Sequence, residues 1–392
     1  MKKKRLVFLL SRFPYPLDKG DKLRAYHQIR SLSVFYDICL IALNDGELSP
    51  NDLDELKTFC QEIRIFPMRH STRYWQLFKN IFNSCPAQVA YFFQPALKAK
   101  IIREIDLFKP DLVFGQLSRT AMYLKELPYQ VVMDFQDAFS ANYFRLSKEG
   151  SLLHRIFYKR EALRMQKFER QMLDWFKNCL IISEADKSCI ARNDKRIHVI
   201  PNGVDTHYFT RRVQSAEPAI LFVGNLSYEP NIQAIQYLVR EILPLLIPKI
   251  PDIQIKITGA NPHPSISALA HKHVQVSGWM DDIRNAYESA TIFVAPLFSG
   301  AGMQNKLLEA MSMQLPCVTT SLVNNGIGAI PDEQLLLAED AATFAKQILY
   351  LYTDKNLREK IAQAGRHFIQ TRYDWNQSNE ILRQQIERIL TQ

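Results

Sequence analysis

The segment 293–311 holds the residues whose types and spacing are best suited to chemistry. An apolar run ends at Pro296, a loop with two glycines follows, and a helical pattern begins near Gln304. Glycine lets the backbone approach a ligand closely, and the N-terminus of a helix presents unpaired N–H groups and a partial positive charge. This order of features predicts a binding site for a diphosphate.

Two charged residues follow on the same helical pattern. Lys306 lies in the first turn, where it adds a full positive charge, and Glu309 lies three residues later on the same face. A carboxylate at that position can accept hydrogen bonds from the two hydroxyls of a ribose. The alternative is an exposed Lys–Glu pair on a helix that only packs on its sheet, since such pairs are common and weak.

Such a site needs a scaffold, and the rest of the sequence predicts one. Short apolar runs alternate with longer amphipathic stretches in both halves, which is the pattern of βαβ units and of parallel sheets covered on both faces. We expect an α/β protein with two doubly wound, Rossmann-like domains facing across a cleft, and ligands at the carboxyl ends of the strands. The predicted strands are Arg5–Leu10, Asp37–Ala42, Glu62–Phe66, Asp111–Gly115, Gln130–Asp134, Cys179–Ile182, Ala219–Val223, Ile253–Ile257, Val274–Ser277, Thr291–Ala295, Cys317–Thr319 and Leu335–Ala338.

The predicted domain boundary lies near Pro201–Asp205. Pro-Asn-Gly is a strong turn signal, and the polar stretch Thr210–Pro218 follows it. We therefore expect an N-terminal domain over residues 1–200 and a C-terminal domain over residues 201–374. A last helix, within residues 375–392, comes after the second sheet is complete.

Composition narrows the classes of function. The net charge of +9 attracts nucleic acid, anionic membranes or anionic substrates. No helix-turn-helix, zinc-finger or RNA-recognition signature is present, so we expect no nucleic acid partner. The cysteines and histidines lack ligand spacing, so we expect no metal site and no disulfide framework. The basic start leads into a first strand without a signal-peptide cleavage site, and a reducing cytoplasm fits best.

Motifs of the second half together resemble those of the retaining glycosyltransferases of family 4, which have the GT-B architecture. Leu308–Val318 is similar to the family's Glu-Ala-Met motif with its following turn and Pro-Val-Val. The other matching segments, in the family's order, are Ile200–Asp205 with Phe209, Leu221–Leu226 with Pro230 and Asn231, Ile257–Gly259, Val276–Asp282 and Tyr373–Trp375. The matches cover about residues 199–390 and are jointly specific. The loop Gly300–Lys306 most resembles sugar transferases of exopolysaccharide and exosortase systems.

The resemblance implies a role for each of these segments. Glu309 would bind the ribose of a nucleotide-sugar donor, Lys306 would bind its diphosphate, and the last helix would cross back to the N-terminal domain. The other donor-binding candidates are Gly302, Met303, Gln304 and Asn305, Gly224 and Asn225 after the first strand of the donor domain, and Trp279 and Met280 in the loop that would face the base.

The sequence also departs from the family pattern. The family often has a second glutamate eight positions before Glu309, where this chain has Ala301. Many members have Arg and Lys after the first strand of the donor domain, where this chain reads Asn225–Glu229. The donor and the full activity therefore stay open.

In the first half, the candidates follow two predicted strands. Lys19, Gly20 and Arg24 lie where the family has a glycine-rich loop that faces donor phosphate and acceptor; the alternative is a solvated basic turn that opens a helix. Gln136 replaces a histidine that lines the family's reaction centre, and Gln cannot act as a general base. Asp137 can accept a hydrogen bond from a sugar, or it can cap the following helix.

Two stretches, Arg73–Phe82 and Tyr91–Lys100, combine cations with aromatic residues. This combination suits an anionic membrane surface. The alternative is aromatic residues in the core with cations that extend to solvent.

The sequence as a whole predicts a glycosyltransferase that moves a hexosyl or related group from a nucleotide sugar to a glycan or lipid-linked acceptor. The resemblance implies retention of configuration, and charge on the leaving diphosphate can be stabilised by Lys306 and helix N-termini without a metal or another cofactor. Two alternatives remain. One is another GT-B enzyme such as a nucleotide-sugar epimerase, and the other is a degenerate binding subunit, as Ala301 and Gln136 suggest.

Overall fold

The computed structural model describes residues 3–17, 19–44, 46, 48–68, 75–78, 80, 84–148, 150–213, 218–299 and 303–391. The chain divides into two compact units. Unit 1 comprises residues 1–202 and 376–392, and unit 2 comprises residues 203–375. The first division lies two residues beyond the predicted boundary at residue 200.

Unit 1 is built on a parallel sheet. Its strand order over the described residues is β3-β2-β1-β4-β5-β6-β7, and every neighbouring pair is parallel. The strands are β1 (Arg5–Leu10), β2 (Asp37–Asn44), β3 (Glu62–Pro67), β4 (Leu112–Gln116), β5 (Gln130–Asp134), β6 (Asn178–Ile181) and β7 (Ile197–Val199). Strand β7 is not among the predicted strands; its three residues, Ile197–Val199, include a histidine and form no apolar run.

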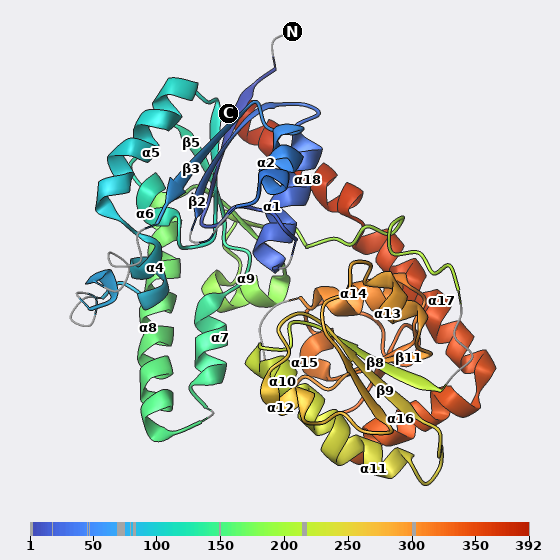
Figure 1. Ribbon diagram of the computed structural model, residues 1–392. Helices are drawn as coiled ribbons and strands as arrows, with labels where there is room; N and C mark the ends of the chain where they lie inside the picture. The colour runs from blue at the N-terminus through green and yellow to red at the C-terminus, as the bar shows by residue number, and fades with distance from the viewer. Residues whose placement is uncertain are drawn as a thin grey trace. The chain divides into compact units, whose positions relative to one another are not determined.

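Helices cover both faces of this sheet (Figure 1). Side chains alternate along a strand, so Leu6 and Phe8 of β1 lie in one core cluster and Val7 and Leu9 lie in the other. The helices of unit 1 are α1 (Gly20–Leu32), α2 (Pro50–Lys57), α4 (Ala87–Phe92), α5 (Pro95–Phe108), α6 (Ala121–Leu124), α7 (Phe139–Leu146), α8 (Leu152–Trp175), α9 (Glu184–Ala191) and α18 (Trp375–Thr391).

Helix α18 belongs to unit 1 although it ends the chain. Leu382, Ile386 and Ile389 are buried in the core cluster that contains Leu6 and Phe8. The Asn379 side chain also donates a hydrogen bond to the carbonyl of His27 in α1, at 3.2 Å. Figure 1 shows the red end of the chain beside the blue helices α1 and α2.

Unit 2 repeats the same architecture. Its strand order over the described residues is β10-β9-β8-β11-β12-β13, again with parallel neighbours. The strands are β8 (Ala219–Val223), β9 (Gln254–Thr258), β10 (Val274–Ser277), β11 (Ile292–Ala295), β12 (Cys317–Thr319) and β13 (Leu336–Leu337). The helices are α10 (Glu229–Tyr237), the π-helix η1 (Leu238–Ile242), α11 (Leu243–Leu246), α12 (Pro264–Ser267), α13 (Arg284–Glu288), α14 (Asn305–Ser312), α15 (Ser321–Asn324), α16 (Ala341–Thr353) and α17 (Lys355–Arg372).

The segments that enter and leave unit 2 lie side by side. Val204 and Asp374 form an isolated parallel bridge, and the Thr206 hydroxyl donates to the Asp374 carboxylate at 2.5 Å. A Cβ on Gly203 would lie 2.7 Å from the Cα of Trp375, so only glycine fits this crossing. The Pro-Asn-Gly turn and the segment Tyr373–Trp375, distant in the sequence, therefore form one structural element.

Both sheets are doubly wound, with strand order reversing beside the first strand. In unit 2 the reversal lies between β8 and β11, because β9 continues on one side of β8 and β11 begins on the other. Ligands of open α/β sheets bind outside the carboxyl ends of the strands at this point. The loops after β8 and β11 are thus the first place to look for a site.

Candidate active site

Lys306 lies at this switch point of unit 2, on the first turn of α14, which follows β11. Its ammonium donates a hydrogen bond to Asn231 Oδ1 at 2.5 Å and lies 4.8 Å from the centre of the Phe222 ring. Asn231 is itself held, because its amide donates to the carbonyl of Asn225 at 2.8 Å. The first turn of α10, itself tied to the loop after β8, therefore fixes the position of the Lys306 charge.

Two glycines allow this close packing. A Cβ on Gly224 would lie 2.8 Å from the Asn231 amide and 3.1 Å from the Lys306 ammonium. A Cβ on Gly259, at the end of β9, would lie 1.7 Å from the Gly224 carbonyl oxygen. Larger residues at either position would push apart the loops that carry the site.

Gly259→Ala is therefore expected to lower the thermal stability of unit 2 and to impair binding at Lys306. Forcing an extra methyl into a packed region typically costs about 1–3 kcal/mol, and the overlap with backbone here cannot be relieved by a side-chain rotation. Differential scanning calorimetry of the variant measures the loss.

Gly278→Ala is the matched control for this substitution, since nothing lies within 4 Å of a Cβ at Gly278. Equal melting temperatures for the two variants would contradict the packing argument.

Glu309 lies one turn beyond Lys306 on α14. It accepts a hydrogen bond from the Tyr287 hydroxyl at 2.7 Å, and Tyr287 is fully buried on α13. The residue is only partly buried, and the Tyr287 hydroxyl contacts one of its two carboxylate oxygens, Oε2. Tyr287 thus orients the carboxylate without blocking it.

The two charged groups lie in a poorly solvated environment. Burial raises the pKa of Glu309 to about 7, and the Tyr287 hydroxyl and the Lys306 charge oppose that rise. Burial lowers the pKa of Lys306 to about 7, and the Glu309 charge opposes that fall. Ionisable groups perturbed by burial and a charged partner are typical of functional sites. An anionic ligand would restore the charge on Lys306, because a nearby negative charge favours the protonated form.

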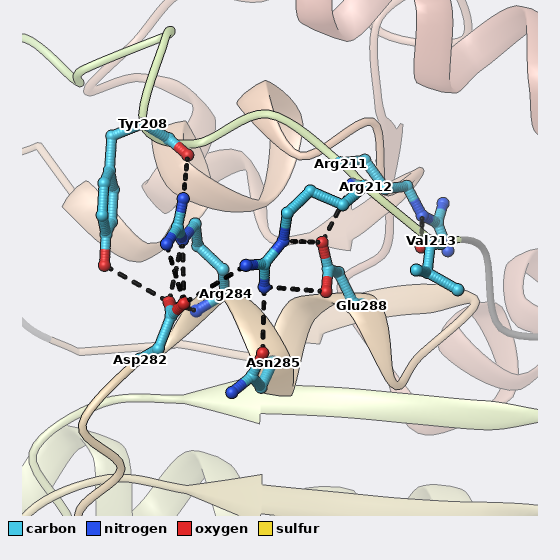
Figure 2. A network of polar contacts seen from close by, with 8 residues as sticks. All are labelled: Tyr208, Arg211, Arg212, Val213, Asp282, Arg284, Asn285 and Glu288. Atoms are coloured by element: carbon cyan, nitrogen blue, oxygen red, sulfur yellow. Dashed lines mark hydrogen bonds and ion pairs between the residues drawn. The ribbon is translucent and has the colours of Figure 1, made fainter.

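A polar network holds α13, which carries Tyr287 (Figure 2). Asp282 accepts hydrogen bonds from Arg284 at 2.8 Å, and Arg212 donates to Glu288 at 2.9 Å. The Arg284 guanidinium lies 4.0 Å from the centre of the Tyr208 ring. The pKa of Asp282 falls to about 2, chiefly through its hydrogen bonds with Arg284. The segment at the start of unit 2, which contains Tyr208 and Arg212, is in this way bound to α13, the helix that carries Tyr287.

The loop that precedes α14 is only partly described. Gly302, a predicted binding residue, and Ala301 lie outside the described residues. Met303 is buried, Gln304 is the N-cap residue of α14, and Asn305 is the first residue of the helix. The side-chain oxygen of Asn305 is buried and has no hydrogen-bond partner among the described residues.

Trp279 and Met280 lie apart from this group of residues. They follow β10, the edge strand, which β9 separates from β8. Trp279 is exposed and Met280 is partly exposed. Their loop continues into Asp282 and then into α13. That helix carries Tyr287, which donates the hydrogen bond to Glu309.

In unit 1, Lys19 and Gly20 lie where α1 begins, after the loop that follows β1. Arg24, on the same helix, is fully buried. It donates hydrogen bonds to Asp134 at 2.7 Å and to Asn202 at 2.9 Å. In this structure Arg24 presents no accessible surface to a ligand, contrary to its predicted role as a direct contact, and instead ties α1 to the end of β5.

Asp137 follows β5, and its backbone position is set by Gln136, whose φ of 64° is left-handed. The capping alternative for Asp137 is wrong. The N-cap of α7 is Ala138 without a side-chain hydrogen bond, and Glu169 of α8 accepts from Ser140 instead. Burial, with repulsion from nearby Asp186, raises the pKa of Asp137 to about 7. Asp137 is therefore a carboxyl group without a capping role, and it stays a candidate.

Two residues of the site, Asn231 and Tyr287, were not predicted to be site residues. Asn231 was noted only within a matching motif, and its bond to Lys306 spans 75 residues. Tyr287 had no signal at all, since a tyrosine in an amphipathic helix is ordinarily a core residue. Both act by holding a charged partner, which only the tertiary contacts show.

Within the described residues, no helix combines the length and the apolar composition that a bilayer crossing requires. The same part of the chain contains no cluster of three or more His, Cys, Asp or Glu residues placed to bind a metal ion.

One protein-family model matches the part of the chain that contains Lys306 and Glu309. Residues 217–354, which include Lys306 and Glu309, match the family model described as Glycosyl transferases group 1. A Klebsiella pneumoniae protein named "Uncharacterized 44.6 kDa protein in cps region" is 25% identical over 386 residues, covering 94% of this chain and 96% of that protein.

Solved structures agree on the fold. A sucrose-phosphate synthase from Thermosynechococcus elongatus matches with a TM-score of 0.74 and 16% identity, covering 99% of this chain and all (100%) of that one. HepE from Anabaena, solved with UDP and glucose, matches with a TM-score of 0.70 and 13% identity, covering 97% of this chain and 99% of that one. The fold is that of the GT-B glycosyltransferases, as predicted.

Proposed function

We propose that this chain, whose residues 217–354 match the family model of group 1 glycosyl transferases, transfers a sugar from a nucleotide-sugar donor to a glycan or lipid-linked acceptor. The observation that carries the proposal is the arrangement at the switch point of unit 2. There Asn231 and Gly224 position Lys306, and Tyr287 positions Glu309. Lys306 would bind the donor diphosphate and Glu309 the ribose hydroxyls.

The proposed chemistry relies on charge stabilisation. Negative charge grows on the diphosphate as the glycosidic bond to the donor breaks. Lys306 and the N–H groups at the start of α14 lie where they can stabilise that charge, and they are pre-positioned, so little reorganisation accompanies the step. We propose that transfer needs no metal and proceeds with retention, the acceptor attacking from the face that the diphosphate leaves.

The acceptor is proposed to bind unit 1. A cavity of about 210 Å³ there is lined by Arg12, Lys19, Lys22, Asn44 and Asp52, among others. Three cations around one cavity suit an anionic group such as the diphosphate of a lipid-linked sugar. The Klebsiella relative from a cps region supports a role in capsule or exopolysaccharide synthesis. We propose that this role is carried out on the cytoplasmic side of the membrane.

The alternatives are an epimerase with the same fold and a binding subunit without activity. An epimerase would alter the nucleotide sugar without an acceptor. A binding subunit would bind the donor but neither transfer nor hydrolyse it. Gln136 in place of a histidine is the observation that keeps the second alternative open.

A panel of nucleotide sugars, screened by thermal shift, tests donor binding. We expect one donor to raise the melting temperature, since a ligand at 100 times its dissociation constant stabilises a protein by about 2.7 kcal/mol. That donor is then incubated with the protein and a membrane extract containing lipid-linked acceptors, with and without EDTA. We expect transfer in both, with the product anomer read by NMR.

Each other outcome has a definite meaning. Loss of transfer with EDTA, restored by magnesium or manganese, would contradict the metal-independent mechanism. Conversion of the donor without acceptor would identify an epimerase. A shift in melting temperature without hydrolysis or transfer for any acceptor would identify a binding subunit.

A further inference from the structure

Helices α7 and α8 form a hairpin in unit 1 whose end is unusually exposed. The helices pack along each other, with the rings of Tyr143 and Tyr158 5.8 Å apart (Figure 1). We call residues 151–160, the first part of α8 with its N-cap Ser151, the hairpin end. All of its residues are exposed except His154 and Tyr158, which are partly buried.

The hairpin end carries an apolar patch. The exposed fractions are 70% for Leu152, 81% for Leu153, 57% for Ile156 and 52% for Phe157. Residues with spacings of one, four and five lie on one face of a helix, and this face is turned away from the side on which Tyr158 meets α7. Single exposed apolar residues are ordinary, but four together on two turns indicate an interaction site.

Cations flank this patch. Arg155, Lys159 and Arg160 are exposed on the hairpin end, and Lys148 is exposed between the two helices. No exposed residue of 151–160 is acidic.

The nearest acidic residues of α8 point inward. Glu161 is buried and accepts a hydrogen bond from the backbone of Ala87, and Glu169 accepts from Ser140. The exposed charged residues of the hairpin end are thus all cationic.

We propose that the hairpin end docks unit 1 on an anionic lipid bilayer. Leucine, isoleucine and phenylalanine would enter the boundary between headgroups and acyl chains, and the cations would contact anionic headgroups. A second copy of this chain is a poorer occupant, because joining two cationic ends brings like charges together. A docked unit 1 would stand where a lipid-linked acceptor is found, which accords with the proposed function without depending on it.

The proposed membrane contact differs from the stretch Tyr91–Lys100 that the sequence suggested. There Phe92 is buried in the core, and Tyr91 and Phe93 pack against it. That stretch therefore supplies core aromatics. Of the other stretch, Arg73–Phe82, only residues 75–78 and 80 belong to the described part of the chain.

Vesicle flotation tests the proposal with the full chain. Vesicles of phosphatidylcholine, with and without phosphatidylglycerol, are the probes. We expect binding only to the anionic vesicles. Replacing Lys148, Arg155 and Lys159 by glutamine should lower the partition coefficient by roughly 100-fold, because each cation near an anionic surface contributes about fivefold. Leu153→Ser with Phe157→Ser should also weaken binding to the anionic vesicles at constant ionic strength, because the apolar side chains would no longer enter the headgroup boundary.

The control removes three exposed lysines of unit 2, in the variant Lys249→Gln, Lys272→Gln, Lys346→Gln. An equal loss of binding in this variant would show attraction by net charge alone and overturn the proposal. Unchanged vesicle binding in the hairpin variants would also overturn the proposal.

Sedimentation velocity of the Leu153→Ser, Phe157→Ser variant tests the other occupant. If the wild type is a dimer and this variant is a monomer, the patch binds a second copy of the chain. Donor binding by thermal shift should stay unchanged in every hairpin variant, so failure here leaves the proposed function intact.

Discussion

Lys306→Ala is expected to lower the turnover number by roughly 100- to 1000-fold, the range seen when one pre-positioned group that stabilises transition-state charge is removed. The ammonium is held by Asn231 at 2.5 Å against the backbone of Gly224, so its charge is fixed before the donor arrives. Because charge on the leaving diphosphate grows during the reaction, the loss should fall on turnover more than on donor affinity. Steady-state kinetics with the preferred donor measures both.

The pH profile separates this role from a structural one. Lys306 is protonated below its pKa, which burial lowers to about 7 in the free protein. Its charge is lost as the pH rises through that value, so kcat/KM should fall on the alkaline side. In Lys306→Ala that alkaline limb should be absent.

Lys346→Ala, which removes an exposed lysine of the same unit, is the control. Near-normal turnover in folded Lys306→Ala, checked by circular dichroism, would show that the diphosphate is not bound here. An exposed lysine paired with a glutamate contributes under about 1 kcal/mol, and its removal would be almost silent.

Glu309→Gln is expected to weaken donor binding by about tenfold or more. A carboxylate that accepts hydrogen bonds from ribose hydroxyls contributes roughly 1.5–3 kcal/mol for each charge-assisted bond, and about 1.4 kcal/mol is a factor of ten. Isothermal titration calorimetry with the nucleoside diphosphate measures this loss. Glu333→Gln, which removes an exposed carboxylate of unit 2, is the control.

The pH dependence of donor affinity has the opposite sign for this residue. Burial raises the pKa of Glu309 to about 7, so the carboxylate is lost as the pH falls through that value. On the acid side, affinity should therefore fall more steeply in the wild type than in Glu309→Gln.

Tyr287→Phe gives a further comparison for Glu309. It removes the 2.7 Å hydrogen bond to Glu309 and a longer one, at 3.4 Å, to the Lys306 carbonyl, and it keeps the carboxylate. We expect a smaller loss of donor affinity, since the charge remains but its orientation is freed. Equal affinities for the wild type and both variants would refute the ribose-binding role.

Local pattern was sufficient to predict the elements of this protein. Largely apolar runs of three to six residues separated by amphipathic stretches identified the strands of both sheets except β7, because burial on both faces leaves that signature in each strand by itself. The same reasoning placed Lys306 and Glu309 at the start of a helix after a strand, since their spacing is a property of one turn of helix.

Contacts between segments far apart in the chain could not be predicted from the sequence. Strand order decides that the loop after β8 meets α14, and only then does Asn231 lie beside Lys306 and Gly259 beside Gly224. Arg24 shows the same limit. Its position in the sequence suggested a ligand contact, but its pairing with Asp134, 110 residues away, buries it.

The exposure of α8 shows why such decisions belong to the tertiary structure. Leu153 and Phe157 are large apolar residues of a helix, yet 81% and 52% of their surfaces are exposed. Periodicity states which residues share a face of a helix, because that depends on neighbours along the chain. Whether the face is covered depends on the packing of segments far apart in sequence, and here that packing leaves it exposed.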